Sequence, residues 1–414
     1  MKKIAVIGAG ISGLSIAHLL KEKYVVKVFE KESKPGGLIK CDVVQGNLYH
    51  KVGGHVFNSK RKDVLNWFWN FFDKECEFTK TIRNSSIYMP QGRIIGYPIE
   101  NHIYMMEESM INRIIEDIFI LVKGQKQEKT LNLEEFLISN FGKTLYEIYF
   151  KPYNQKIWKE ELHEIPLSWL EGKLPMPKLE EIVFNNFIHA KETNMVHSSF
   201  FYPKYNGSQF LADRLAKDIN IEYNSNINFI DGQASSWNIQ GETFDSVIFC
   251  GNIKDLLSSL NGVDLPSYDN EISSLKYHGT TSVLCEIEDT PYSWIYLPDN
   301  NYDAHRIICT GNFASSNNAS EKIKTATIEF TDFFEENDIL QQIRKIPFSL
   351  KYITHTFTQY TYPIQNSDTR TIINSIKKEL EKKAFFLLGR FAEWEYYNMD
   401  AAIGAAIDLS KKFN

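Results

Sequence analysis

The sequence contains little cysteine, and its cysteines show no regular spacing. The five residues are an odd number, and no two of them form a Cys-x-x-Cys pair. They are Cys41, Cys76, Cys250, Cys285 and Cys309. Structural zinc sites need closely spaced ligands, and disulfide frameworks need an even set of cysteines. We therefore expect reduced, buried cysteines and no metal site.

Long hydrophobic runs and blocks of positive charge are also missing. No uninterrupted apolar stretch reaches the roughly 18 residues that span a membrane, and glycines soon interrupt the apolar start. The net charge of −6 and the lack of a Lys/Arg block argue against a nucleic-acid partner. These absences predict a cytoplasmic protein without a membrane segment.

The chain does have the length and the apolar content of a globular protein with several domains. Its 414 residues suffice for two or three domains, and 43% of them are hydrophobic. Aromatic residues make up 14% of the sequence, so most of them must pack in cores. A single aromatic residue is therefore weak evidence for a binding site.

The first thirty residues carry the clearest local pattern. Apolar residues 3–7 lead into the turn Gly8-Ala9-Gly10-Ile11-Ser12-Gly13, a helix follows, and a second strand ends at Glu30. In a dinucleotide-binding unit, these glycines provide a tight turn, a close approach to a pyrophosphate, and close packing of helix on strand. The helix N-terminus then offers free N–H groups to phosphates, and Glu30 can accept the ribose hydroxyls.

The residues after Glu30 favour FAD over a nicotinamide nucleotide. Lys31 is followed by Pro35-Gly36-Gly37-Leu38, and a second glycine pair just after the acid is typical of flavoproteins that hold FAD extended. An ordinary turn is the alternative. Further on, Gly53 and Gly54 precede His55 and would let the backbone pass close to a flat ring. A hairpin turn beside a hydrogen-bonded histidine explains that stretch equally well.

Patterns along the chain predict an α/β fold. Residues 1–85, 200–265 and 380–414 show strand and helix patterns typical of a Rossmann-like FAD-binding domain made from separate segments. Residues 86–199 are mainly helical after two short strands, and residues 266–379 alternate as in an antiparallel sheet. Residues 151–158 interrupt the helical pattern, so we expect a loop there.

Several motifs taken together resemble the FAD-dependent UDP-galactopyranose mutase family, from Met1 nearly to the C-terminus. They are the N-terminal glycine turn, Gly53-Gly54-His55, Tyr97-Pro98-Ile99-Glu100-Asn101, Tyr153-Asn154-Gln155-Lys156-Ile157-Trp158, Trp294-Ile295-Tyr296-Leu297-Pro298 with Arg306, Tyr362-Pro363, and Gly389-Arg390-Phe391-Ala392-Glu393 with Tyr396-Tyr397. The stretch from Trp294 to Arg306 is more similar to the eukaryotic-type branch of the family than to its shorter bacterial members.

The resemblance implies a redox-neutral isomerase. The family interconverts the pyranose and furanose forms of a nucleotide-diphosphate sugar, UDP-galactose or a related one, for cell-surface polysaccharide synthesis. Its active cofactor is reduced FAD, whose N5 forms an adduct with the sugar, and NAD(P)H is the expected reductant. Whether the protein forms a homodimer stays open.

The resemblance also assigns residues to roles. The implied catalytic residues are Arg306, Lys173, His55, Tyr296, Tyr362 and Tyr396. The implied substrate-binding residues are Tyr97, Glu100, Tyr153, Trp158, Lys173, Tyr296, Arg306, Tyr362 and Tyr396, which places the nucleotide clamp in the mainly helical domain. The implied cofactor-binding residues are Gly8, Gly10, Ile11, Ser12, Gly13, Glu30, Lys31, Gly36, Gly37, Leu38, Gly53, Gly54, His55, Gly389, Arg390, Tyr396, Asn398 and Met399.

Three of these positions depart from the family pattern. Arg306 and Lys173 occupy the positions of the two diphosphate arginines, but a lysine lacks the planar fork that meets a phosphate with two hydrogen bonds. Many bacterial members carry an acid at the position of Asn398, and Asn or Gln at that of Glu100. The identity of the sugar therefore stays open.

Two other functions share the same fold. An oxidoreductase of the amine-oxidase or phytoene-desaturase type would also bind FAD, but it would need an apolar substrate tunnel. It would not explain a clamp from Tyr153 to Trp158 beside paired cations. A flavoprotein without catalysis, acting as a binding or scaffold protein, has no specific support in the sequence.

Overall fold

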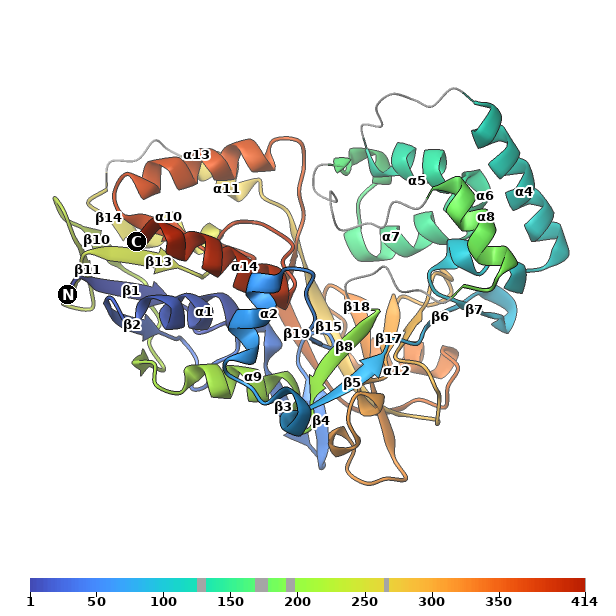
Figure 1. The fold of residues 1–414 in the computed structure, drawn as a ribbon, viewed down its shortest axis with the longest axis horizontal. Coiled ribbons are helices and arrows are strands. Elements are labelled where there is room, and N and C mark those ends of the chain that lie inside the picture. The colour runs from blue at the N-terminus through green and yellow to red at the C-terminus, as the bar shows by residue number, and fades with distance from the viewer. Residues whose placement is uncertain (125–131, 168–177, 191–197, 264–267, 414) are drawn as a thin grey trace.

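The computed structural model describes residues 1–124, 132–167, 178–190, 198–263 and 268–413. A parallel sheet flanked by helices lies at the end of the molecule that carries both termini (Figure 1). The helices between residues 108 and 187 lie at the opposite end, and a large, mostly antiparallel sheet lies between the two regions. Segments far apart in the sequence therefore meet in the middle of the molecule.

The parallel sheet has five strands in the order β20-β13-β1-β2-β9. Their bounds are Lys3–Ile7 (β1), Val25–Phe29 (β2), Ile221–Glu222 (β9), Ser246–Phe249 (β13) and Phe385–Leu387 (β20). Every neighbouring pair is parallel. The strands come from three separated parts of the chain, as the predicted discontinuous α/β domain requires.

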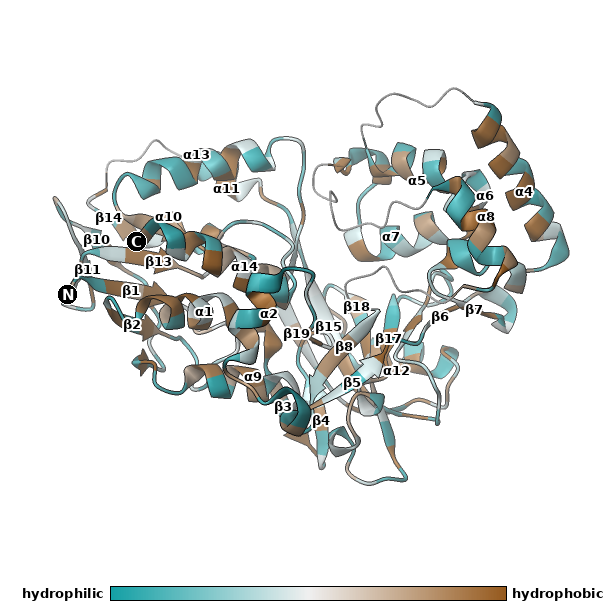
Figure 2. Ribbon diagram, in the orientation of Figure 1, coloured by the Kyte–Doolittle hydropathy of each residue, from teal (hydrophilic) through white to brown (hydrophobic). Residues whose placement is uncertain are grey.

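Both faces of this sheet are buried. Ile4 and Val6 point into one core, and Ala5 and Ile7 point into another on the opposite face. This is why its strands are nearly continuous in hydrophobic residues (Figure 2). The first face packs against α1 (Ile11–Leu20), α2 (Lys62–Trp69), α9 (Gly207–Ala216) and α14 (Met399–Ser410). The second packs against α10 (Ile253–Ser259), α11 (Asp269–Ser273), α13 (Thr369–Glu381) and the small sheet of β10 (Ile230–Gly232), β11 (Trp237–Ile239), β12 (Glu242–Phe244) and β14 (Leu260–Asn261).

The central sheet has seven strands in the order β19-β15-β18-β17-β16-β6-β7. Their bounds are Ser85–Tyr88 (β6), Ile94–Gly96 (β7), Tyr277–Ile287 (β15), Trp294–Tyr296 (β16), Arg306–Ile308 (β17), Lys324–Thr331 (β18) and Lys351–Pro363 (β19). Neighbours are antiparallel except β6 and β16. Although we placed the two short strands β6 and β7 at the start of the mainly helical domain, they extend this sheet. The domain boundaries themselves stay a prediction.

Alternation along these strands separates two surfaces. Trp294 and Tyr296 on β16 join the core shared with the helical region, whereas Ile295 joins the core under α12 (Glu336–Lys345). Tyr296 is the direct antiparallel partner of Arg306 on β17. Two predicted site residues therefore stand side by side on the face toward the helices.

The helical region consists of α4 (Glu108–Lys123), α5 (Leu133–Phe141), α6 (Lys143–Leu145), α7 (Lys151–Trp158) and α8 (Leu179–Phe187). The loop expected at residues 151–158 is wrong, because this stretch is α7. Pro152 lies in its first turn, where no N–H is needed and the fixed φ suits a helix. A turn of π-helix, Tyr146–Phe150, leads straight into α7. Among the described residues, no helix is long and apolar enough to cross a membrane.

Short elements fill the space between these parts. They are β3 (Cys41–Val44) paired with β4 (Asn47–His50), β5 (Phe78–Ile82) paired with β8 (Ser199–Pro203), and α3 (Lys74–Glu77). The expectation that all cysteines are buried is wrong for Cys76, which is exposed. It lies in α3, which has only four residues and buries none of them.

A candidate cofactor crevice beside an aromatic cleft

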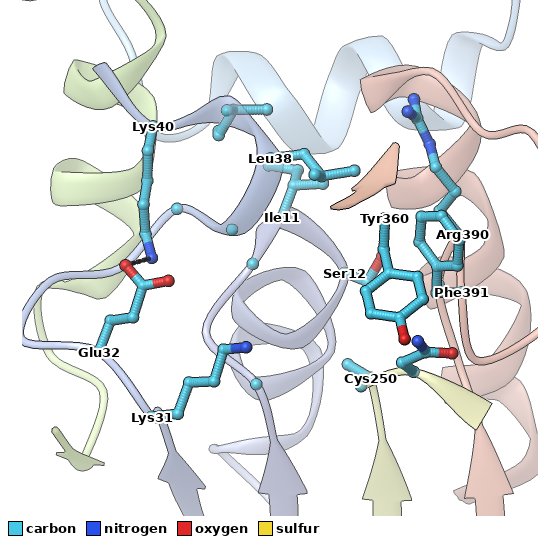
Figure 3. A pocket seen from close by; sticks show the side chains of 18 of the residues that line it. Ile11, Ser12, Lys31, Glu32, Leu38, Lys40, Cys250, Tyr360, Arg390 and Phe391 are labelled. Atoms are coloured by element: carbon cyan, nitrogen blue, oxygen red, sulfur yellow. Dashed lines mark ion pairs between the residues drawn. The ribbon is translucent and has the colours of Figure 1, made fainter. Parts of the chain in front are cut away.

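A cavity of about 670 Å³ opens at the carboxyl ends of β1, β2 and β13. The strands point toward it from one side, and Arg390, Phe391 and Tyr360 border it from the other (Figure 3). β1 lies between β13 and β2, which is the point where the strand order of an open α/β sheet reverses and where ligands bind.

The first glycine turn forms one wall of this crevice. Gly8 has a φ of 106°, which favours glycine, and a Cβ on Gly13 would lie 1.9 Å from the carbonyl oxygen of Gly8. A Cβ on Gly10 would meet nothing closer than the Cα of Gly37, at 3.9 Å. The N-terminus of α1 has no side-chain cap, so its first N–H groups face the crevice. This is the geometry of an anion-binding helix N-terminus.

The second glycine pair closes over the first. Gly36 forms a β-bridge with Gly10, and a Cβ on Gly37 would lie 3.2 Å from the Cα of Gly10. Gly36 and Gly37 both have positive φ, at 130° and 55°. Glycine at these positions therefore allows the two turns to pack against each other, in addition to leaving room for a ligand.

Glu30 directly follows β2 and lines the crevice. Its buried carboxylate accepts hydrogen bonds from the backbone N–H of Ala9 at 2.7 Å and of Glu32 at 3.0 Å. Each oxygen keeps a second lone pair that a ribose hydroxyl could use. Beside it, Glu32 forms an ion pair with Lys40 (Figure 3).

The two glycines of the first turn give a matched prediction. Gly13→Ala should lower the free energy of unfolding by about 3 kcal/mol, because its Cβ collides with backbone that cannot move aside. Gly10→Ala should leave the thermal midpoint nearly unchanged and lower only the flavin content, since its Cβ would occupy ligand space. Calorimetry and visible absorbance measure the two effects. An unchanged midpoint for Gly13→Ala would contradict the close packing.

His55 borders the crevice from the loop after β4. One ring nitrogen lies 3.0 Å from the carbonyl oxygen of Leu38, and burial lowers the pKa of His55 to about 4. The ring is therefore neutral at pH 7. A Cβ on Gly54 would lie 2.6 Å from Ile308, and one on Gly53 would lie 3.5 Å from the Glu329 carboxylate. Gly54 therefore lets this loop lie against β17, whereas Gly53 is favoured by its φ of 61°.

Arg390 connects the crevice to a second group of residues. Its guanidinium donates to the carbonyl oxygens of Tyr397, at 3.0 Å, and of Thr361, at 3.1 Å. It also lies 4.9 Å from the centre of the Tyr396 ring. Burial lowers the pKa of Arg390, and no carboxylate of the described residues pairs with it. It thus faces the crevice as an uncompensated cation.

Aromatic residues from five parts of the chain pack together in one cluster next to Arg390. Tyr362 stacks on Tyr396 at 5.5 Å, and Trp158 meets both rings edge-on at 6.0 and 6.3 Å. Tyr296 contacts Tyr153 at 5.3 Å. Tyr97 adds a ring 4.7 Å from Tyr296. We call these six residues the aromatic cleft.

Arg306 brings a positive charge into the cleft. It donates to the hydroxyl of Tyr362 at 3.1 Å and forms an ion pair with the buried Glu329 of β18. Burial alone would raise the pKa of Glu329, but Arg306 and His305 hold it at about 2. Burial likewise opposes the charge of Arg306, and Glu329 more than offsets it, so the pKa of Arg306 stays above its usual range. Both groups are charged at pH 7.

Two tyrosines of the cleft, Tyr153 and Tyr362, keep their protons. Burial raises the pKa of Tyr153 and of Tyr362 well above the usual value. Neutral hydroxyls can donate hydrogen bonds to phosphate oxygens without charge repulsion. The cleft therefore combines flat rings, hydroxyl donors and a guanidinium.

Helix α7 is fixed to the sheet at two points. Lys156 donates to the carbonyl oxygens of Leu297 at 2.7 Å, Asp299 at 2.5 Å and Ala304 at 3.4 Å. His278 of β15 lies 2.7 Å from the carbonyl oxygen of Trp158. The helix that carries Tyr153 and Trp158 is thus anchored to β15 and to the connection between β16 and β17.

The structure brings most of the predicted site residues together. Predicted cofactor residues that line the crevice are Gly8, Gly10, Ile11, Ser12, Glu30, Lys31, Gly36, Gly37, Leu38, His55, Gly389, Arg390, Asn398 and Met399. Gly13, Gly53, Gly54 and Tyr396 are not among the residues that line it. Glu100 is buried near Tyr149, which stacks on Tyr153. Burial raises the pKa of Tyr149, and the charge of Glu100 adds to that increase. Lys173 lies outside the described residues.

Sequence reasoning missed Glu329 and Arg83. Glu329 is the one acid in β18, Lys324–Thr331, and a single acid in an otherwise buried strand is a usable signal. Arg83 lies in the short connection between β5 and β6 and donates to the Tyr296 hydroxyl. Nothing in its local sequence indicates that contact.

Several known proteins are similar to this chain in sequence and fold. The NAD(P)-binding Rossmann-like domain family matches residues 6–74. The chain is 24% identical to a dTDP-fucopyranose mutase of Escherichia coli, covering 100% of this chain and 98% of the relative. It is 23% identical to a UDP-galactopyranose mutase of Mycoplasma genitalium, covering 99% and 94%. A solved structure of reduced UDP-galactopyranose mutase matches with a TM-score of 0.88 at 22% identity, covering 100% and 96%.

The resemblance to the UDP-galactopyranose mutases is confirmed. The match extends over the whole chain, and it also confirms the predicted fold class. Oxidases share the fold at a greater distance: a putrescine oxidase structure matches with a TM-score of 0.65 at 13% identity, covering 99% of this chain and 98% of that one.

Proposed function

We propose that this chain is an FAD-dependent mutase that interconverts the pyranose and furanose forms of a nucleotide-diphosphate sugar. The names of its full-length relatives support a sugar carried on UDP or dTDP. A product destined for cell-surface polysaccharide and NAD(P)H as the reductant belong to the same proposal.

The crevice fits FAD. The two glycine turns and the uncapped N-terminus of α1 would hold the pyrophosphate, and Glu30 would accept the ribose hydroxyls. Arg390 and the neutral His55 would border the isoalloxazine ring. When bound and reduced, FAD would supply N5 as the nucleophile toward the anomeric carbon.

The aromatic cleft supplies the binding groups that the reaction needs. Tyr153 and Trp158 offer flat rings to the base, and Arg306 offers two directed N–H donors to the departing diphosphate. Tyr296, Tyr362 and Tyr396 would donate hydroxyl protons to its oxygens and border the sugar. The packed rings would exclude water while the diphosphate is detached, so that it stays in place to return.

One observation carries the proposal: Arg390 touches both the crevice and the ring of Tyr396. A flavin in the crevice and a sugar in the aromatic cleft would therefore meet. An amine or alkene oxidoreductase would need an apolar tunnel at this place, whereas the cleft holds a guanidinium and tyrosine hydroxyls. The mutase is favoured over the oxidoreductase for that reason.

The test is to incubate the dithionite-reduced protein with a panel of nucleotide sugars, including UDP-galactose and dTDP-fucose. We expect a new furanose product by NMR or HPLC, with no stoichiometric consumption of reductant. The oxidised protein serves as the inactive control. Oxygen consumption with peroxide formation on an amine, and no furanose product from any nucleotide sugar, would favour the oxidoreductase instead.

A further inference from the structure

We infer that Arg83 is a second anion-binding residue of the aromatic cleft and compensates the charge of the substrate diphosphate. The inference rests on the proposed function and adds a residue to that site. Arg83 lies two residues before the start of β6, outside the motifs that carried the resemblance. Its side chain is half-buried.

The contacts of Arg83 place its guanidinium against the cleft. It donates to the hydroxyl of Tyr296, and its central carbon lies 5.5 Å from the ring centre of Tyr97 and 4.6 Å from that of Trp294. Its Nε donates to the Ser85 hydroxyl at 2.7 Å. Two aromatic faces and two hydroxyls therefore fix the position of the group.

Two arginines approach the cleft in the same way. Arg83 donates to the hydroxyl of Tyr296, and Arg306 donates to the hydroxyl of Tyr362. Tyr296 is also the strand partner of Arg306. An anion bound to these tyrosine hydroxyls would therefore have a guanidinium on either side.

The charge balance distinguishes the two arginines. Arg306 already forms an ion pair with Glu329, so that pair carries little net charge. Among the described residues, no carboxylate lies within ion-pair distance of Arg83, and only hydroxyls and aromatic faces compensate it. A diphosphate carries a negative charge on each phosphate. A half-buried cation without a counter-ion is where that charge is best balanced.

Paired ligands that differ only in the phosphates test this inference. With FAD bound to the wild-type protein, calorimetry measures the Kd of UDP and of uridine, and the Kd of dTDP and of thymidine. Each diphosphate is compared with its own nucleoside. Of UDP and dTDP, the one that the wild-type protein binds more tightly is used for the variant. Arg83→Ala should weaken its binding about 10- to 100-fold, because charged hydrogen bonds to the phosphates are lost. Binding of the matching nucleoside should change by no more than about twofold. Arg93→Ala is the matched control, since Arg93 pairs with Glu107 at the surface.

The outcomes separate the two proposals. If the wild-type protein binds neither nucleoside diphosphate, the proposed function fails. If it binds one and Arg83→Ala binds it equally well, only the role of Arg83 fails. Flavin content and thermal midpoint show whether the variant is folded.

A second measurement needs no variant. In the wild-type protein, phenylglyoxal modifies accessible arginines, and peptide mapping reports the rate at Arg83. The bound diphosphate, but not its nucleoside, should slow that modification. Equal rates with and without the diphosphate would overturn the inference.

Discussion

Arg306→Ala should lower kcat/KM by about a thousandfold or more, which is the scale of losing a directed donor to developing negative charge. The guanidinium is fixed by Glu329 and by the Tyr362 hydroxyl, so it needs no reorganisation when the diphosphate departs. Bound FAD should remain at the wild-type level, because Arg306 does not line the crevice. Steady-state assays with the best nucleotide sugar measure the loss, and a near-normal kcat/KM would remove Arg306 from the site.

The same substitution should also destabilise the fold, for a separate reason. It leaves the Glu329 carboxylate buried without its counter-ion, which typically costs about 3–5 kcal/mol. The double variant Arg306→Met/Glu329→Gln removes both charges and should recover most of that stability while staying inactive. Arg344→Ala, at an exposed position of α12, is the control. Recovery of activity in the double variant would show that only folding, and no substrate contact, depended on Arg306.

The parts of this structure that could be predicted from the sequence are those in which the interacting residues lie close together in the chain. The glycines of β1–α1–β2 stand within a few residues of the strand and helix that they connect, and Glu30 directly follows the next strand. The role of each of these residues follows from its distance along the sequence to the neighbouring strand or helix. The wall of the crevice formed by the two glycine turns could therefore be predicted, whereas its lining from residues 225–259 and 356–360 was not.

The aromatic cleft depends on strand register and helix docking, which local spacing does not encode. Arg306 meets Glu329 because β17 and β18 are antiparallel partners in that register. Arg83 reaches Tyr296 although 213 positions separate them in the chain. The sequence supplied the family positions of the cleft residues, but neither the counter-ion of Arg306 nor the second arginine followed from it.

The error at α7 has a similar origin. A proline inside a helix usually ends it, so Pro152 in this polar stretch indicated the end of the preceding helix. In the structure the proline occupies a first turn, and the face of α7 with Lys156 and Trp158 is buried against the sheet. Tertiary contacts, including the hydrogen bonds of the Lys156 side chain, stabilise a helix whose own sequence favours it weakly.

Lys156→Met should therefore disturb both folding and the cleft. Methionine matches the length of the side chain, but it leaves three carbonyl oxygens without their donor, two of which are buried contacts. Unsatisfied buried acceptors of this kind should lower the free energy of unfolding by about 3 kcal/mol. Denaturant titration measures that loss, and Lys159→Met, at an exposed position after α7, should show almost none.

The effect on the reaction should appear mainly in KM. Leu297 follows Tyr296 directly, and Ala304 lies two residues before Arg306. The Lys156 side chain therefore ties the helix with Tyr153 and Trp158 to the strands with the diphosphate donors. When α7 loosens, the base clamp and the diphosphate site are no longer held at a fixed separation. KM for the nucleotide sugar should rise about tenfold or more, as expected when a preorganised site must be ordered on binding. A KM equal to that of Lys159→Met would show that α7 keeps its place without Lys156, and that the other anchor, at His278, holds the clamp.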